Sequence, residues 1–488
     1  MNSKRCAVLV AFAAIFSLSS CSGVGDTCKV NCGGGGGGTA SLNVTLAAVP
    51  FVPPPSTSIL SFAVTINSVT LIPANGGSAY TIPLNATTYS VDLTHLQSDS
   101  VFLGQSITVP AGTYNQVKVG VSSAIVTYCV ATSGIPGCNA NSIAQFNAGP
   151  STPVTPTSAF TLASNQQAGI QVRINLGNAM TVNAVTQAVT AADLTAANVF
   201  TAVALPPTAS TLAQNQLDYI EDITGTVSAV APNSVTVQTA TLGSITSVIT
   251  GSTLVSQSCV VLNQACTATV GQVVSMDATL NSDGSSSMLY FDPLTFSSVD
   301  LIEGIVTSET ASNTQFQIVA NNFVNASSNS LISGLNLGDT VNVTLANLTA
   351  GFFVDSKGLT VNGTFFGSTS ATDIHTGQTV MIHVTAFTAK SGNTPAKATA
   401  DGVVLRFTRF AAAASQAGNI QFSITSLPPF YGFTAQPQVL LSTGSPITYL
   451  DGYSSIGSIN SGDTLGIRAL YFGTGVTPQF SAAKIRNN

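Results

Sequence analysis

The stretch IQVRINL, residues 170–176, alternates apolar and polar side chains at every position. Because successive side chains of an extended strand point to opposite faces, this alternation predicts a β-strand with one apolar face. Similar runs occur at 62–72 and 117–121, and turn sequences such as Asn75-Gly76-Gly77 separate them. Residues 40–206 are therefore predicted to form an antiparallel β-sandwich.

The segment 185–198 is the one predicted helix of this region. It is rich in alanine, and Thr190 is a candidate N-cap. Elsewhere the composition favours strands and turns, since Thr, Ser, Asn, Val and Gly abound. We therefore expect an all-β protein, in which an N-terminal antiparallel β-sandwich is followed by tandem small β-barrel modules.

Charge is scarce in this chain. Only 7% of the 488 residues are charged and the net charge is −6, which argues against nucleic acid as a partner. The shortage of Lys and Arg also removes a polybasic route to membranes. With 44% hydrophobic residues, the chain can bury enough apolar surface to fold, and its length predicts about two to four domains.

A resemblance covers about a third of the chain. In order, it is carried by FAVTINSVTLI (62–72), YSVDLTHL (89–96), ITVPAGTYNQVKVGV (107–121) and FTLASNQQAGIQVRINLG (160–177). This order resembles the bacterial domain of unknown function 4382. The resemblance implies a β-sandwich in exported, often lipidated proteins, without a known activity. Arg173 and Asn175 replace acidic residues that commonly accompany the last strand of the family, so no site is predicted on them.

A repeated glycine element marks the C-terminal half. Gly-Asp/Gln-x-Val/Leu recurs in TVGQVVSM around Gly271, NLGDTVNV around Gly338, HTGQTVMI around Gly377 and NSGDTLGI around Gly462. The glycine is expected to have a positive φ and the next polar residue to cap the turn. On this interpretation Asp339 and Asp463 are turn residues rather than metal ligands.

A second element places a strand directly after a glycine, at Gly225, Gly304 and Gly402. Together the two elements predict a linker at 207–218 and three β-barrel modules at 219–298, 299–411 and 412–488. The repetition resembles the domain of unknown function 5666, a short β-barrel unit often found in tandem in exported proteins.

Residues 1–20 are typical of a bacterial lipoprotein signal peptide. Lys4 and Arg5 form a basic start, 7–18 an apolar run, and small residues precede Cys21, which would become the lipidated, palmitate-bearing N-terminus. The apolar run falls short of the ~20 residues that span a bilayer. The alternative is an ordinary secretory signal in which Cys21 has no role.

The region after Cys21 predicts a tether and an address. Residues 21–39 contain Gly33–Gly38, a flexible run that would let the folded part stand off the membrane. Ser22 follows the cysteine where no Asp is present, which favours sorting to the outer membrane. The expected partner is therefore the membrane, through the N-terminal lipid.

Six further cysteines fall in neighbouring pairs. In an oxidising envelope such pairs most simply form disulfides that close short loops. A metal site is the weaker interpretation, because no histidine lies near any pair. The predicted disulfides are Cys28–Cys32, Cys129–Cys138 and Cys259–Cys266.

Signals for catalysis are weak. The chain contains no nucleophile elbow, phosphate loop or paired-histidine zinc motif. His383 is expected to be a solvated strand residue and His375 to cap a turn; a metal site of both with Asp373 is the alternative. Asn281–Gly284 is predicted to be a hairpin turn rather than a calcium loop. No catalytic residue, metal or cofactor is predicted.

Two groups of residues remain as candidates. Asp218, Glu221 and Asp222 cluster and could supply the carboxylate pair of a glycoside hydrolase, but they precede a strand in what looks like a linker, where solvation explains them. The aromatic side chains Phe430, Tyr431 and Phe433 are the candidate ligand-binding residues, since such loops stack on sugars or peptides when they are not buried against a neighbouring module.

The sequence thus predicts a non-enzymatic, lipid-anchored cell-envelope protein. Its expected role is binding, adhesion or scaffolding, with envelope proteins or glycans as partners. The alternative is a glycan-binding or glycan-degrading envelope lipoprotein whose site lies at a module junction.

Overall fold

The structure is a computed structural model and describes residues 38–487, with interruptions. The interruptions are 132–134, 139–141, 206–211, 213, 256–267, 295–299, 311–313, 326–328, 347–352, 360–373, 419, 434–435, 445 and 472–478. The predicted signal peptide, Cys21, the pairs Cys28–Cys32 and Cys259–Cys266, and Asp373 therefore lie outside the described residues. Among the residues described, no helix has the length and apolarity to cross a membrane.

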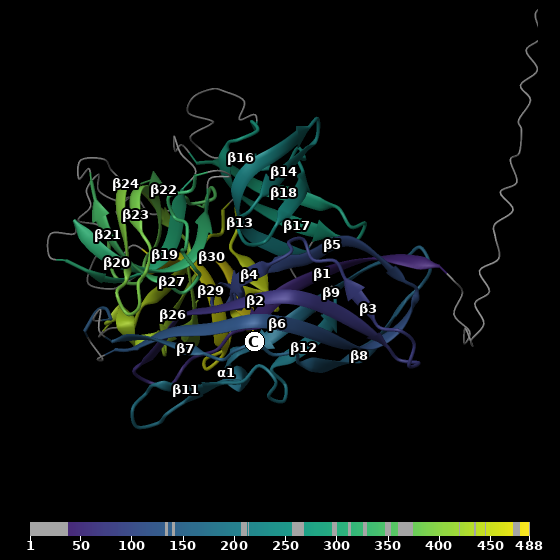
Figure 1. The fold of residues 1–488 in the computed structure, drawn as a ribbon, viewed down its shortest axis with the longest axis horizontal. Helices are drawn as coiled ribbons and strands as arrows, with labels where there is room; N and C mark the ends of the chain where they lie inside the picture. The colour runs from purple at the N-terminus through teal and green to yellow at the C-terminus, as the bar shows by residue number, and fades with distance from the viewer. Residues whose placement is uncertain are drawn as a thin grey trace, which may run out of the picture. The chain divides into compact units, whose positions relative to one another are not determined.

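The N-terminal region is a β-sandwich, as predicted (Figure 1). One sheet has the order β12-β9-β1-β5, with β12 at Phe200–Ala204, β9 at Gln167–Asn175, β1 at Thr39–Val49 and β5 at Val101–Pro110. The other has the order β3-β2-β6-β7, with β4 added to β2 and β8 to β6. Its strands are β2 (Thr57–Pro73), β3 (Tyr80–Ile82), β4 (Tyr89–Asp92), β6 (Gly112–Val130), β7 (Ile143–Asn147) and β8 (Val154–Leu162).

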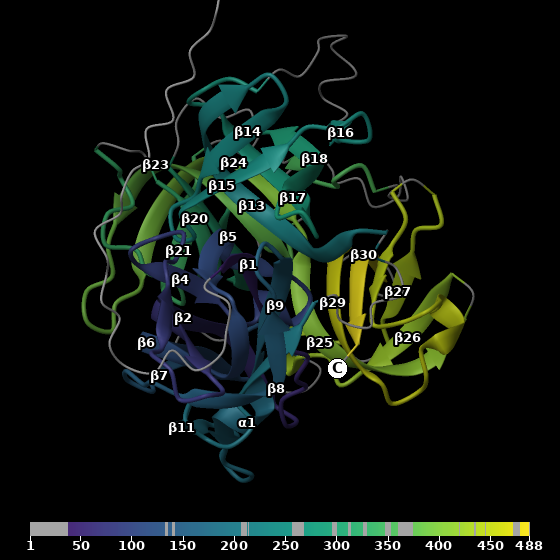
Figure 2. The same cartoon turned by 90° about the vertical axis from the view of Figure 1, so that its right-hand side faces the viewer.

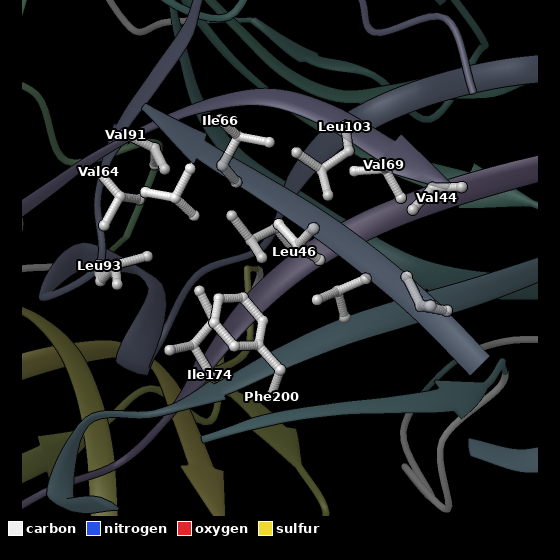
Figure 3. Packing of buried hydrophobic residues seen from close by; sticks show 14 of the residues in the cluster. Val44, Leu46, Val64, Ile66, Val69, Val91, Leu93, Leu103, Ile174 and Phe200 are labelled. Carbon is white, nitrogen blue, oxygen red and sulfur yellow. The ribbon is translucent and has the colours of Figure 1, made fainter. Parts of the chain in front are cut away.

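The sandwich is not antiparallel throughout. β1 pairs in parallel with β9 over nine residue positions, from Ser41 opposite Gln167 to Val49 opposite Asn175. The first strand of the domain inserts between β9 and β5, and this long-range pairing leaves no local signal in the sequence. The alternation of 170–176 holds, because Ile170, Val172 and Ile174 are at most 1% exposed and face the core shown in Figure 3.

The predicted helix at 185–198 is wrong. The segment instead contains β11 (Val189–Ala192), which pairs with β10 (Met180–Val182). The side chain of Asn183 accepts hydrogen bonds from the backbone N–H groups of Val185 and Thr186, so local turns replace helical bonding. Among the residues that the structure describes, helical structure is limited to a short turn before β10, α1 (Leu176–Ala179), and to 3-10 turns, including η1 (His95–Gln97), η4 (Pro429–Tyr431) and η5 (Ile456–Ser458).

Three six-stranded sheets follow in the described part of the C-terminal half. The first contains β13 (Gln216–Ala231), β14 (Ser234–Gln238), β15 (Ser244–Val248), β16 (Leu254–Val255), β17 (Val273–Asn281) and β18 (Ser286–Pro293). The second contains β19 (Leu301–Glu309), β20 (Gln315–Val324), β21 (Thr340–Leu345), β22 (Phe353–Val354), β23 (Thr379–Thr388) and β24 (Ala396–Arg406). The third, yellow in Figure 2, contains β25 (Thr408–Ala417), β26 (Gln421–Thr425), β27 (Gln438–Leu441), β28 (Tyr449–Asp451), β29 (Thr464–Tyr471) and β30 (Gln479–Asn487).

All three sheets close into barrels in the same way. The five longer strands of each follow the order 1-2-3-5-4 and return to strand 1, and the third and fifth strands pair in parallel. This is the topology of the OB-fold, a five-stranded Greek-key barrel. The first barrel begins at Gln216, inside the predicted linker. The third begins at Thr408, before the predicted boundary at 412, so only Phe407 separates β24 from β25.

The first glycine element has one backbone geometry at all its positions. Gly271, Gly338, Gly377 and Gly462 have φ values of +90°, +84°, +93° and +93°. The N–H of each glycine donates to the carbonyl of a residue in a neighbouring strand. The N–H of that same strand residue donates to the carbonyl of the residue that follows the glycine, and all these distances are 2.7–2.9 Å. The next polar side chain caps the turn, as when Asp463 Oδ2 accepts the N–H of Asn460 at 2.8 Å. The predicted turn role of Asp339 and Asp463 is confirmed.

The elements are not all equivalent in the barrels. Gly271, Gly377 and Gly462 precede the fourth strands β17, β23 and β29, whereas Gly338 precedes the third strand of barrel two. For the second element, Gly225 and Gly304 lie in the first strands β13 and β19, but Gly402 lies in the fifth strand β24. Gly402 is therefore not equivalent to Gly225 and Gly304, because so short a motif does not specify which strand it occupies.

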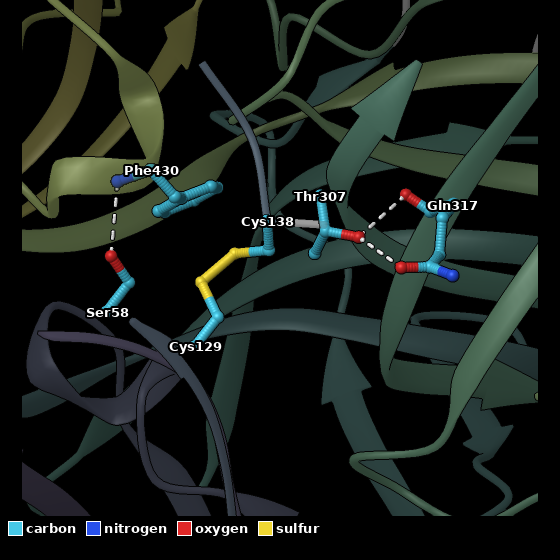
Figure 4. Close-up of a disulfide and its surroundings, with 6 residues drawn as sticks. All are labelled: Ser58, Cys129, Cys138, Thr307, Gln317 and Phe430. Carbon is cyan, nitrogen blue, oxygen red and sulfur yellow. Dashed lines mark hydrogen bonds between the residues drawn. A yellow bond between two sulfur atoms is a disulfide. The ribbon is translucent and has the colours of Figure 1, made fainter. Parts of the chain in front are cut away.

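The disulfide Cys129–Cys138 is present, with its Cα atoms 6.0 Å apart (Figure 4). Its loop contacts two barrels. Cys138 N–H donates to the carbonyl of Thr307 in β19, and Gly137 N–H donates to that of Phe430, both at 2.7 Å. The loop that the disulfide closes is thus hydrogen-bonded to the second and third barrels.

Replacing Cys129 and Cys138 together by alanine is expected to lower the free energy of unfolding by about 2–3 kcal/mol, because the short loop is then free in the unfolded chain. Urea unfolding of the variant measures the loss, and peptide mapping of the unreduced protein checks the pairing. An unchanged free energy of unfolding would show that the bridge adds nothing to stability.

Candidate functional site

A large group of buried charged side chains gathers where the four β-modules meet. We call this cluster the ionic junction. Its carboxylates are Asp99 of the sandwich, Glu221, Asp222 and Asp277 of barrel one, Glu303 and Asp355 of barrel two, and Asp451 of barrel three. Its cations are Lys357, Arg406, Arg409, Arg468, Lys484 and Arg486, six of the 13 Lys and Arg residues in the chain. Each of the six cations is at most 6% exposed.

Arg406, at the end of β24, joins barrel two to barrel one. Its guanidinium is fully buried and donates to Asp355, to Asp222 Oδ1 at 3.0 Å and to Thr224 Oγ1 at 3.0 Å. Its Nε also lies 3.4 Å from Glu303 Oε2. A planar guanidinium with several fixed donors suits such a site better than a single ammonium group.

Arg409, in the first strand of barrel three, reaches the sandwich. Its Nε donates to Asp99 Oδ2 at 2.9 Å, and its Nη1 lies 3.3 Å from Glu303 Oε1. It also forms an ion pair with Asp222. One side chain therefore links carboxylates from three modules.

Asp222 is presented to these arginines by a β-bulge. The ladder between β13 and β17 shifts register between Ile220 and Ile223, and Asp222 has a φ of +55°. Bulges redirect side chains at functional or structural sites, and a positive φ at a non-glycine residue persists only when its surroundings hold it. Here the carboxylate of Asp222 also lies 3.2 Å from Arg468 Nη2, so ion pairing accounts for the conformation.

The last strand of the chain completes the junction. Lys484 Nζ lies 2.5 Å from Glu221 Oε1, and Arg486 Nε lies 2.8 Å from Asp451 Oδ2. Arg486 also donates to the carbonyls of Leu96 and Asp99, at 2.9 and 2.7 Å. The C-terminal strand is thereby fastened to the segment around η1 of the sandwich.

The cations lower the pKa of several aspartates in the ionic junction. Burial opposes ionisation of Asp99, but Arg409 and Arg468 outweigh it and lower the pKa. The same balance, with Arg468 and Lys357, lowers the pKa of Asp277. In Glu303 burial prevails over Arg406, and the pKa is raised. Burial and then Arg409 lower the pKa of His95, beside the junction, to about 4, so its imidazole is neutral.

Little space remains inside the junction. A cavity of about 40 Å³ is lined by residues of three modules, among them His95, Asp99, Glu221 and Glu303. That volume holds on the order of one to a few water molecules. No group of three or more metal-ligating side chains occurs among the described residues. The arrangement joins parts of one protein, with each carboxylate facing a cation.

Burial raises the pKa of Glu221 to about 7, although Lys484 opposes the rise. The unfolded chain releases this proton near pH 4.5 and the folded chain near 7, so the folded state binds more protons in between. The stability that Glu221 contributes is fully present below the unfolded pKa of 4.5 and is lost as pH rises through the folded pKa of about 7. The free energy of unfolding falls over this range by up to about 1.4 kcal/mol per pH unit. Glu221→Gln is expected to remove this part of the slope in unfolding measured at several pH values.

A matched control for this titration is Asp283→Asn. Asp283 is exposed, and hydrogen bonds from Ser285 lower its pKa, so it titrates below the pH range in question. The control should keep the wild-type slope. An equal slope in Glu221→Gln and the wild type would contradict the assignment.

The cluster of acidic residues noted in the sequence contains two members of the ionic junction, Glu221 and Asp222, although no ion-paired junction was predicted there. Asp218, Glu221 and Asp222 do not lie in a solvated linker; they belong to β13 and are little exposed, because the strand starts at Gln216. Asp218 accepts hydrogen bonds from Thr45 and Gln171 of the sandwich, at 2.9 and 2.8 Å.

The basic members were missed altogether. The available signal was a charged residue inside an apolar strand, as in VVLRF around Arg406 and GIRAL around Arg468. In a chain with so few charges, such positions indicate buried partners.

The histidines do not form a site with one another. His383 was expected to be solvated, but it is 5% exposed in β23, a strand that pairs with β19 on one side and β24 on the other. Its Nδ1 lies 2.5 Å from Asp401 Oδ1. His375 N–H donates to Gln378 Oε1 at the turn, and its ring Nδ1 is 3.8 Å from Glu309 Oε1. The predicted hairpin turn at 281–284 is confirmed, with Gly284 N–H donating to the carbonyl of Asn281 at 3.0 Å.

The aromatic candidates divide between core and groove. Phe430 and Tyr431, in η4, are 1% and 3% exposed and pack between the sandwich and barrel three. Phe430 N–H donates to Ser58 Oγ at 3.2 Å, and the Tyr431 hydroxyl is 3.3 Å from Thr408 Oγ1. Phe433 is half-buried and, with one side of Tyr431, lines an open groove of about 410 Å³.

The comparison with known families concerns the sandwich. Residues 38–207 match the model of a family described as Domain of unknown function (DUF4382). No curated protein matches the chain. The family match supports the resemblance of the N-terminal region, and it assigns no activity.

Proposed function

We propose that the chain is a lipid-anchored cell-envelope protein with a non-enzymatic binding, adhesion or scaffolding role. The observation that carries this proposal is the ionic junction, in which side chains of all four β-modules are paired with one another. Ion pairs that connect all four modules suit a protein whose modules stay fixed relative to one another. The carboxylates that a hydrolase could use, including Glu221 and Asp222, are paired with Lys484 and Arg406 instead.

The proposed address rests on the N-terminal sequence. We infer a signal peptide at 1–20, lipidation of Cys21, a glycine tether and sorting to the outer membrane, from the residue pattern already described. The disulfide Cys129–Cys138 suits an oxidising compartment. The tandem barrels fit the resemblance to the domain of unknown function 5666, which we likewise propose.

Cys21→Ser is expected to abolish metabolic labelling of the chain by a fatty-acid probe, because the acyl chains have no other proposed attachment point. Cys6→Ser is the matched control, since that cysteine would leave with the signal peptide, and its labelling should equal that of the wild type. Undiminished labelling of Cys21→Ser would refute the anchor.

The binding role is tested by capture of envelope proteins on the full chain, purified in detergent, with glycans assayed in parallel. Specific capture that is retained after washing would support the proposal. Hydrolysis of a glycan or peptide during the assay, lost on replacement of Glu221 or Asp222, would overturn the non-enzymatic part. Of the glycan alternatives, binding is favoured by one observation, the groove beside Phe433.

A further inference from the structure

The groove beside Phe433 has rigid walls. Six of its 14 lining residues are prolines, from the run Pro53–Pro55 of the sandwich and from Pro428, Pro429 and Pro437 of barrel three. Proline fixes φ, so these walls lose little freedom when a ligand binds. The volume of about 410 Å³ lies within the range of about 300–1,000 Å³ that is usual for small-ligand sites.

The ring of Phe433, which lines the groove, packs against three other aromatic rings. The ring centroid of Phe433 lies 5.6 Å from that of Tyr431, 5.6 Å from that of Tyr471 and 6.4 Å from that of Phe480. These distances are typical of packed aromatic clusters. The half-exposed ring therefore offers a fixed apolar face to whatever enters the groove.

The polar groups of the groove are all neutral. Ser56, Thr425, Ser426 and Gln436 supply hydroxyl and amide groups, and none of the lining residues carries a charge. A charged ligand would lose its hydration without gaining an ion pair. The groove consequently favours a neutral ligand that has both apolar faces and many hydroxyl groups.

We propose that this groove binds a neutral oligosaccharide. The C–H face of a sugar ring would stack on Phe433 and the proline rings, while its hydroxyl groups would exchange hydrogen bonds with Gln436 and the serine and threonine side chains. This site deepens the proposed binding role and rests on it. A proline-rich peptide, the other ligand that aromatic grooves commonly take, is an outcome of the test.

The test uses the full chain in detergent and three neutral probes: cellohexaose, maltohexaose and N-acetylchitohexaose. Calorimetric titration is expected to show binding of at least one probe. Phe433→Ala should weaken that binding at least about tenfold, and Phe433→Tyr, which keeps the ring, should retain it. The matched control is Phe353→Ala, which removes a 63% exposed phenylalanine from β22 of barrel two and should leave affinity unchanged.

Phe433→Leu guards against a folding defect, because it preserves apolar volume while removing the ring face; it should bind as weakly as Phe433→Ala with circular dichroism like that of the wild type. Absence of binding of all three probes at millimolar concentration would overturn the inference, as would undiminished binding by Phe433→Leu. Binding of a proline-rich peptide that is lost in Phe433→Ala would overturn it too. Any of these results, together with retained capture of envelope proteins, would leave the broader proposed function standing.

Discussion

Replacing Arg406 by methionine is expected to lower the free energy of unfolding by about 3–5 kcal/mol, the usual cost of removing one partner from a buried ion pair. Arg406 is fully buried and contacts Asp222, Glu303 and Asp355. Methionine fills much of the volume but leaves these carboxylates with fewer cations in a medium of low polarity. Urea unfolding followed by circular dichroism measures the loss.

The matched control lies on the same strand. Lys397, near the start of β24, is exposed, and Lys397→Met should change the free energy of unfolding by no more than about 0.5 kcal/mol. Both substitutions remove one positive charge, so their difference isolates burial and pairing. A loss below about 1 kcal/mol in Arg406→Met would contradict a structural role for the junction.

Gly377→Ala should destabilise the protein by about 2–5 kcal/mol. Gly377 has a φ of +93°, which costs a residue with a side chain about 1–2 kcal/mol. An added Cβ would also lie 2.2 Å from Cε1 of the buried Tyr431 ring, and such overpacking costs about 1–3 kcal/mol more. Chemical unfolding of the variant gives the sum.

Gly462→Ala separates the two causes, because Gly462 occupies the corresponding turn of barrel three with the same φ of +93° and nothing within 4 Å of an added Cβ. Only the backbone cost of about 1–2 kcal/mol is expected there. Equal losses in the two variants would show that Tyr431 gives way without cost. In the double variant Gly377→Ala with Tyr431→Ala, the steric part of the loss should disappear.

Local patterns could be predicted from the sequence because their causes are local. The alternation at 170–176 follows from strand geometry, and the turn at Gly462 follows from the freedom of glycine. Cys129 and Cys138 are close in sequence, so their pairing is the simplest disulfide. The error at 185–198 has the same kind of origin, since alanine content outweighed the turn made by Asn183.

The candidate sites depend on residues that are far apart in the chain. Arg406 and Asp222 are 184 residues apart, and Arg409 and Asp99 are 310 apart. No spacing rule connects such pairs. The groove likewise needs Pro53–Pro55 and Phe433 to come together from different modules, so the sequence could identify the aromatic run but not its neighbours.

The sequence by itself determined which segments become strands and turns, because side-chain alternation and glycine conformation act over a few residues. Only the tertiary structure decided what each face meets. On β9, Val172 faces the sandwich core, while its neighbour Gln171 is 2% exposed and donates a hydrogen bond to Asp218 of barrel one. The polar face of IQVRINL is thus also covered, at Gln171, by barrel one. Strand geometry is a local property of a few residues, whereas the packing of one module on another depends on the whole chain.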